Sequence, residues 1–135
     1  MSVKNYALAA LDYTKSIESG DASSTNYYNR GACRIQGGNY KGALEDLNKA
    51  VEMDPTDAEF NYERGKAKHY LKMYSAALED LNKAISLDPK YGSAYNQRGN
   101  TKYEMKDISG ACADWKKSAE LGNATAKLNI ADFCK

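Results

Sequence analysis

The sequence of 135 residues contains little proline, a single histidine and no long run of apolar residues. A membrane-spanning helix needs about 18 or more consecutive apolar residues, so none is predicted. Nineteen Lys and Arg residues oppose eighteen Asp and Glu residues, which gives a formal charge of +1. Most nucleic-acid-binding proteins attract phosphates with a clear excess of positive charge. We therefore expect neither a membrane nor a nucleic acid as a partner.

Cysteines are few as well, and they stand at positions 33, 112 and 134. Their odd number and the lack of a Cys-x-x-Cys pair predict neither a disulfide framework nor a zinc site. Cys33 and Cys112 are expected to pack as small residues on helices, and Cys134 to be an exposed thiol. The first residues lack the basic and apolar segments of a secretory signal. We expect a reducing, cytoplasmic environment.

Groups that would support catalysis are scarce. His69 has no cysteine partner nearby in sequence, and Gln36-Gly-Gly-Asn lacks the spacing and the lysine of a phosphate-binding loop. Adjacent carboxylates such as Glu45 and Asp46 point in different directions on a helix. The sequence therefore predicts a noncatalytic protein that binds no metal and no cofactor.

An internal repeat with a period of about 34 residues organises the chain. Pro55 and Pro89 are separated by one period, and the octapeptide Ala-Leu-Glu-Asp-Leu-Asn-Lys-Ala occurs at 43–50 and again at 77–84. When 24–57 is aligned with 58–91, fourteen of the aligned positions are identical. We divide the single domain, 1–135, into a half repeat (5–19), three repeats (24–57, 58–91 and 92–123) and a final segment (124–134).

Each repeat is predicted to form two helices joined by a turn. Between Tyr40 and Met53 the apolar residues recur at helical spacing, and Asp54-Pro55 ends the helix because proline disfavours a helical residue before it. Helix pairs of this kind bury their apolar faces by stacking, and an array needs a cap at its end. We therefore predict an all-α solenoid of antiparallel helix pairs that forms a right-handed superhelix, with 124–134 as a C-terminal capping helix.

Glycine recurs inside the first helix of every repeat. Each such glycine costs about 1 kcal/mol relative to alanine. A close approach of the second helix would explain this cost, because alanine recurs at one position of the second helices. The predicted pairs of small residues are Gly31 with Ala43, Gly65 with Ala77, and Gly99 with Ala111.

The repeat resembles the tetratricopeptide repeat family, whose pattern is Trp-x2-Leu-Gly-x2-Tyr, then Ala-x3-Phe, then Pro, over about 34 residues. The resemblance covers nearly the whole chain. The glycines and alanines above hold the Gly and Ala places of the pattern. The remaining matches are Tyr27 and Tyr95 at the Trp place, Leu47, Leu81 and Trp115 at the Phe place, and Pro55 and Pro89 at the Pro place.

Arginine stands in each repeat where the family pattern has leucine. Arg30, Arg64 and Arg98 recur with the repeat, as do Asp12, Asp46, Asp80 and Asp114. Each of the first three aspartates precedes an arginine of the next repeat by eighteen residues. We interpret the two series as an internal ladder of ion pairs between consecutive repeats; the alternative is an anion-binding row of arginines.

The resemblance implies a scaffold that binds an extended peptide or a partner protein in a concave groove lined by the first helices. Some relatives clamp the terminal carboxylate of chaperones with Lys, Asn and Arg. Here the corresponding places hold Tyr28, Ala32, Glu63, Ser93 and Gln97, so that mode is disfavoured. A solvated helix face is the alternative for these residues. The predicted binding surface consists of Tyr28, Asn29, Tyr62, Glu63, Lys66, His69, Tyr70, Asn96, Gln97, Asn100 and Tyr103.

A second hypothesis concerns the N-terminal helix. The half repeat 5–19 corresponds to a second helix, and no first helix precedes it. Ala7, Ala10, Leu11 and Thr14 would then lack their usual cover. The alternative function is an assembly module, which self-associates through this helix or docks within a longer protein.

Overall fold

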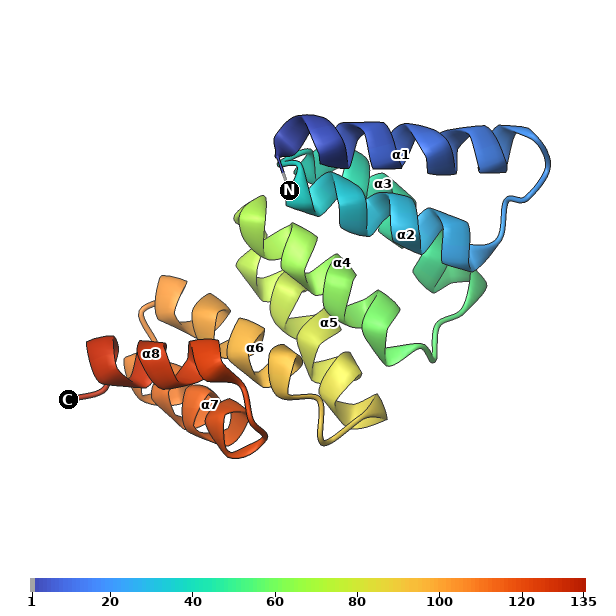
Figure 1. The fold of residues 1–135 in the computed structure, drawn as a ribbon. Coiled ribbons are helices and arrows are strands. Elements are labelled where there is room, and N and C mark those ends of the chain that lie inside the picture. Colours follow the sequence, from blue (N-terminus) through green and yellow to red (C-terminus); the bar gives the residue numbers. More distant parts are fainter. Residues whose placement is uncertain (1) are drawn as a thin grey trace.

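The computed structural model describes residues 2–135, and this range contains eight α-helices and no strand. Short turns join the helices, which follow one another as a stacked array from one end of the molecule to the other (Figure 1). The helices are α1 (Val3–Glu18), α2 (Ser24–Gln36), α3 (Tyr40–Met53), α4 (Ala58–Tyr70), α5 (Tyr74–Leu87), α6 (Gly92–Glu104), α7 (Ile108–Glu120) and α8 (Ala124–Phe133).

Neighbouring helices pack in sequence order. The pairs α2 with α3, α4 with α5, and α6 with α7 make the most extensive contacts, and each second helix then packs on the next first helix. At the ends of the array α1 packs on α2 and α8 packs on α7. The predicted all-α solenoid is therefore confirmed. No helix within residues 2–135 combines the length and the apolar character needed to cross a membrane.

Local signals in the sequence fix where the helices begin and where the pairs turn. The Ser23 hydroxyl accepts a hydrogen bond from the backbone N–H of Asn26, and the Asp57 carboxylate accepts one from that of Phe60. Such side-chain caps satisfy donors that the first turn leaves free. Between first and second helices, Gly38, Lys72 and Lys106 have φ values of 85°, 63° and 70°. A residue in the left-handed region therefore closes the turn in every repeat.

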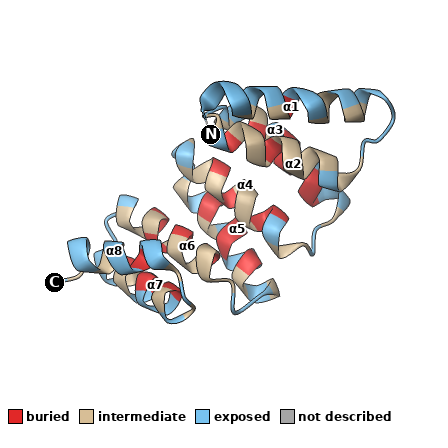
Figure 2. Cartoon of the chain, viewed as in Figure 1, coloured by how far each residue is buried: buried red, intermediate tan, exposed pale blue. Residues whose placement is uncertain are grey.

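Small residues form the contact between the two helices of each repeat, and Figure 2 shows buried segments on the helices from α2 to α7. Ala43, Ala77 and Ala111 are completely buried. A Cβ atom on the recurring glycine of the first helix would meet a large side chain of the second helix. The nearest atoms would be Leu47 Cγ at 2.8 Å from Gly31, Leu81 Cγ at 3.0 Å from Gly65, and the Trp115 indole at 2.7 Å from Gly99.

The ion pairs form a ladder, but their predicted register is wrong. Arg64 donates two hydrogen bonds to Asp80, at 2.9 and 2.8 Å, rather than pairing with Asp46 of the preceding repeat. Asp46 and Asn48 lie on different sides of α3, and it is Asn48 that faces α4 and contacts Arg64. The pairs observed are Arg30 with Asp46, Arg64 with Asp80, and Arg98 with Asp114, each sixteen residues apart within one repeat.

A second cation completes each buried pair. Arg34, Lys68 and Lys102 lie 2.9, 2.9 and 3.0 Å from the carboxylates of Asp46, Asp80 and Asp114. The remaining guanidinium nitrogen of each first arginine reaches the preceding second helix. Its acceptors are Thr14, Asn48 and Asn82, at 3.0, 3.4 and 3.0 Å. Each arginine thus links its own repeat to the one before.

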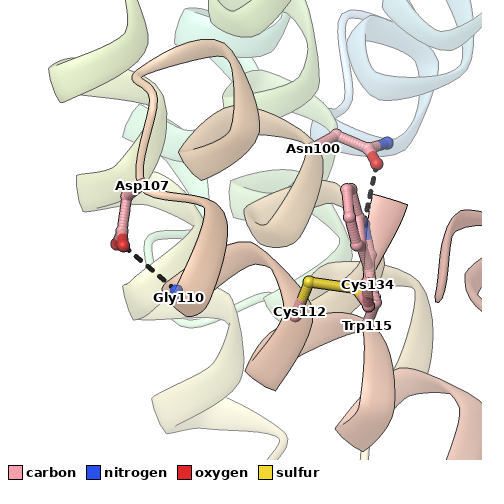
Figure 3. Close-up of a disulfide and its surroundings, with 6 residues drawn as sticks. All are labelled: Asn100, Asp107, Gly110, Cys112, Trp115 and Cys134. Atoms are coloured by element: carbon pink, nitrogen blue, oxygen red, sulfur yellow. Dashed lines mark hydrogen bonds between the residues drawn. A yellow bond between two sulfur atoms is a disulfide. The ribbon is translucent and has the colours of Figure 1, made fainter. Parts of the chain in front are cut away.

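Two cysteines that were expected to be free form a disulfide. Cys112 on α7 is bonded to Cys134, the residue that follows α8, and Figure 3 shows the bond beside Trp115. The prediction failed because the two cysteines are 22 residues apart in sequence and meet only when α8 folds back on α7. Disulfides are typical of oxidising compartments, whereas the sequence favoured a reducing one. Cys33 is a free thiol, and burial raises its pKa.

Candidate functional site

The residues of the predicted binding surface lie on α2, α4 and α6. These three first helices contact one another along the array, α2 with α4 and α4 with α6. Repetition of the structural unit brings equivalent positions of successive first helices side by side. Among the eleven residues Gln97 is buried, Tyr70 is exposed and the others are half-buried.

Tyrosine and glutamate side chains gather where α2 meets α4. The Tyr28 ring stacks on Phe60 with centroids 4.9 Å apart, and its hydroxyl donates a hydrogen bond of 3.3 Å to Glu59. Tyr62 packs against Tyr91, just before α6, at a centroid distance of 5.0 Å. We call Tyr28, Glu59, Tyr62, Glu63 and Tyr91 the tyrosine–glutamate cluster.

Burial and negative charge perturb the ionisation of this cluster. Burial raises the pKa of the Glu63 carboxyl, and the nearby Lys66 ammonium opposes that shift. Burial and the charge of Glu63 raise the pKa of Tyr62. Burial raises the pKa of Tyr91 most, and the charges of Tyr62, Glu59, Glu63 and Tyr28 raise it further. The shared charge effects place the five side chains in one electrostatic environment.

Lys66 lies next to this cluster. Its ammonium is 3.7 Å from a Glu63 carboxylate oxygen and 5.4 Å from the centre of the Tyr62 ring. The first distance is long for a charge-assisted hydrogen bond, and the second is within the range of a cation–π contact. A positive charge is therefore already accommodated against this carboxylate and this ring.

His69 and Tyr70 have structural contacts at the C-terminal end of α4. His69 Nδ1 is 2.9 Å from the Thr101 hydroxyl, which itself donates to the Gln97 carbonyl at 3.0 Å. Since that hydroxyl uses its proton on the carbonyl, it accepts from His69, so Nδ1 carries the proton. Tyr70 stacks on Tyr40 at 4.8 Å.

Four of the predicted residues lie on α6, where α8 covers part of the surface. The Asn129 side chain of α8 donates to Asn96 and Asn100, at 3.2 and 3.3 Å. Tyr103 packs against Phe133 at 4.7 Å and against Trp115 at 5.8 Å. The capping helix therefore takes up hydrogen-bonding capacity that the sequence assigned to a ligand.

Two of the predicted residues have no such partner within residues 2–135. Gln97 is 5% exposed, and its amide nitrogen is buried without a hydrogen-bond partner. Asn29 is half-buried on α2. Tyr91, by contrast, belongs to the cluster but was not predicted, because its position after Asp88-Pro89 indicates a loop rather than a first helix.

An apolar pocket of about 260 Å³ lies away from the predicted surface, between α1 and α2. Ala10 and Gly37 line it, and the corresponding residues one repeat later are Leu44 and Leu71. The alignment of the repeats could have indicated this pocket, because small residues stand at both positions where the next repeat has leucine. The lining is Val3, Tyr6, Ala7, Ala10, Leu11, Thr14, Cys33, Arg34, Gly37 and Asn39.

The described residues offer no group of three or more His, Cys, Asp or Glu side chains placed to hold a metal ion. The chemistry of the predicted surface is therefore that of aromatic rings, amides, one half-buried glutamate, one lysine and one histidine. Such side chains contact other molecules through stacking and hydrogen bonds.

Solved structures with this arrangement of helices include two TPR domains and the protein MamA. The second TPR domain of human RPAP3, in complex with an HSP70 peptide, is 25% identical, with a TM-score of 0.73 over 81% of this chain and 92% of that chain. MamA from Desulfovibrio magneticus RS-1 is also 25% identical, with a TM-score of 0.80 over 87% and 67%. The TPR domain of Arabidopsis OM64 is 23% identical, with a TM-score of 0.79 over 84% and 95%.

A comparison with curated protein sequences gave no significant match. The family model described as TPR repeat matches residues 31–72 and 69–106, which together span more than half of the chain. The helix pairs, the glycine contacts and this match agree with one another. The chain belongs to the tetratricopeptide repeat family.

Proposed function

We propose that this protein is a noncatalytic interaction module that binds an extended peptide segment of a partner protein on the first-helix surface of α2, α4 and α6. The observation that carries the proposal is the half-exposed row of tyrosine and amide side chains on adjacent first helices. Tyrosine supplies contact area at a low cost in rotamer entropy, and amides can pair with a peptide backbone. The complex of RPAP3 with an HSP70 peptide supports peptide binding by this fold.

The ligand differs from a chaperone tail in its charge. Three of the places from which some relatives clamp a terminal carboxylate hold Tyr28, Ala32 and Glu63 here. The pKa of Glu63 is raised, and above that pKa its charge repels an incoming carboxylate. We therefore propose an internal peptide segment rather than an acidic C-terminus as the ligand.

Assembly through α1 is a second candidate function. Val3, Leu8 and Leu11 are 64%, 53% and 48% exposed on this helix. Exposed apolar side chains that lie close together are typical of surfaces that contact another protein. This candidate predicts that association between copies weakens when Leu8 and Leu11 are replaced by glutamate.

Selection from a peptide display library tests the first function. A selected peptide should bind the Tyr62→Ala variant at least tenfold more weakly, because this ring lies on the proposed surface. Tyr13→Ala on α1, another half-buried tyrosine but outside α2, α4 and α6, should bind normally. Circular dichroism checks that each variant folds. Unchanged binding to the Tyr62→Ala variant would contradict the proposed surface.

Light scattering separates the two candidates. If the protein is a peptide-binding module, it remains monomeric at high micromolar concentration. If it is an assembly module, its apparent molar mass increases with concentration. Growth that Leu8→Glu/Leu11→Glu abolishes, together with the failure of every library peptide to bind, would favour assembly instead.

A further inference from the structure

We propose that the tyrosine–glutamate cluster is a subsite for one cationic side chain, arginine or lysine, of the bound peptide. This inference rests on the peptide-binding function proposed above and specifies the chemistry of its ligand. Four features of the cluster support it: the accessible carboxylate of Glu59, the weak ion pair of Glu63, the aromatic rings, and the net negative charge of the site.

The Glu59 carboxylate is available to a ligand. Glu59 is exposed at the start of α4, and among residues 2–135 its one hydrogen-bond donor is the Tyr28 hydroxyl, at 3.3 Å. An ionised carboxylate offers about four lone-pair directions, so most of its accepting capacity is free. A guanidinium or ammonium group can approach it from solvent.

The Glu63 carboxylate is only loosely neutralised. Its side chain is 13% exposed, and Lys66 is its ion-pair partner at 3.7 Å. Charge-assisted N–H···O bonds are ordinarily about 2.7–2.9 Å long, so this pair leaves the carboxylate incompletely satisfied. Burial of a carboxylate is costly without close partners, and a second cation would reduce that cost.

The aromatic rings of the cluster favour a cation over an anion. Tyr62 and Tyr91 pack together with centroids 5.0 Å apart, and the Lys66 ammonium already lies 5.4 Å from the Tyr62 ring. The negative faces of such rings attract ammonium and guanidinium groups. Arginine fits best, because its planar group stacks on a ring and donates to carboxylates at the same time.

The local charge also favours a cation. Two carboxylates and one ammonium leave the cluster and Lys66 with an excess of one negative charge when Glu59 and Glu63 are ionised. Basic side chains at the places from which some relatives clamp a carboxylate would bind an acidic peptide. Here two of those places hold Tyr28 and Glu63. The surface is thus complementary to a peptide that carries a positive charge opposite α4.

A positional-scanning library of seven-residue peptides tests this inference. The wild-type protein should enrich arginine or lysine at one position. The selected peptide should lose at least tenfold in affinity for the Glu59→Gln/Glu63→Gln variant, and replacing its basic residue by glutamine should cause a similar loss in the wild type. The two losses should not add when both changes are combined.

The matched control is Glu45→Gln/Glu52→Gln on α3, where two exposed glutamates lie on a second helix. This control makes the same change of net charge and should bind the selected peptide with wild-type affinity. Enrichment of peptides without a basic position, or equal affinity of the Glu59→Gln/Glu63→Gln variant, would overturn the cationic subsite and leave peptide binding standing. If no library peptide binds, both proposals fail.

Discussion

Each buried aspartate of the array is held by two cations, and this is the main departure from the family pattern at the scale of single residues. In the second repeat, Asp80 accepts hydrogen bonds from Arg64 and lies 2.9 Å from Lys68. The Asp80 side chain is 7% exposed and that of Arg64 is 22% exposed. Removal of the single anion would leave two partly buried cations facing each other without compensation.

The Asp80→Asn variant should therefore be less stable than the wild type by about 3 kcal/mol, the lower end of the range for breaking a buried pair, since the cations keep some contact with water. Urea unfolding followed by circular dichroism measures the difference. Glu79→Gln, an exposed neighbour with the same change of charge, should alter stability by less than about 0.5 kcal/mol. Equal stability of the two variants would show that the ladder contributes little.

His69 is a second residue with a measurable signature. Burial lowers its pKa below the ordinary value near 6.5, although Glu104 opposes the shift, and the rings of Tyr70 and Tyr74 enclose it. In the unfolded chain the His69 imidazole becomes protonated near pH 6.5, whereas in the folded protein it becomes protonated only at a lower pH. The stabilising contribution of neutral His69 is complete above about pH 6.5 and is lost as the pH falls from there toward its folded-state pKa.

The wild-type protein should thus lose stability relative to His69→Gln as the pH falls from 7 to 5. Unfolding free energies measured at half-unit intervals for both proteins give the difference, which removes the opposite contribution of Glu63, whose pKa is raised. A difference that stays constant with pH would contradict the lowered pKa of His69.

Residue contacts were predictable only where the repeat itself carries them. The glycine in each first helix and the buried alanine opposite were evident because they recur, and the structure bears them out. The partner of Arg64 was not evident, because Asp46 and Asp80 recur with the same period. Which of them faces α4 depends on the rotation of α3 and of α5 about their own axes, and the period of the repeat leaves that rotation undefined.

At the scale of elements, α8 is held in place by contacts with α6 and α7 and by a disulfide. It packs on α7, places Ala126 in a buried cluster with Trp115, and is followed by the disulfide from Cys134 to Cys112. The Asn100 amide oxygen accepts a hydrogen bond from the Trp115 indole N–H, which Figure 3 shows. It also accepts one from the Asn129 amide of α8, so the cap and the last repeat share one contact network.

Reduction of this disulfide should destabilise the protein by about 3 kcal/mol, as expected from the entropy of closing a loop of this length. The double variant Cys112→Ser/Cys134→Ser should show the same loss in urea. Trp115, the single tryptophan, is 2% exposed and packs on Phe133, so release of α8 should shift its emission to longer wavelength.

Cys33→Ser, in which the disulfide stays intact, is the control for this prediction. This substitution should leave the packing of α8 unchanged, because Cys33 lies on α2. Emission and stability that do not change on reduction would show that α8 holds its place without the bond.

Helices were easier to predict from the sequence than their end contacts. The recurring apolar spacing and Asp54-Pro55 indicated the bounds of α3, Tyr40–Met53, because these signals act within one helix. The contact of α8 with Asn96 and Asn100 was not indicated. It joins segments far apart in the sequence through side chains that occur in no other repeat, so neither periodicity nor local propensity contains it.

At the scale of the whole molecule, stacking of equivalent helices generates a continuous surface from residues far apart in sequence. Tyr28 and Glu59 meet although they are 31 residues apart, and Tyr62 meets Tyr91 in the same way. A scaffold of this kind fixes the spacing of its contact residues through the repeat length. We propose that the specificity of this surface depends on a few side chains, the aromatic and acidic ones of the tyrosine–glutamate cluster.

Hydrogen exchange with and without a library-selected peptide tests the central claim most directly, because it locates the bound peptide on the molecule. The account predicts protection of α2 and α4 around the tyrosine–glutamate cluster, together with the start of α6, and unchanged exchange in α1. Protection concentrated in α1, with α4 unaffected, would contradict binding on the first-helix surface.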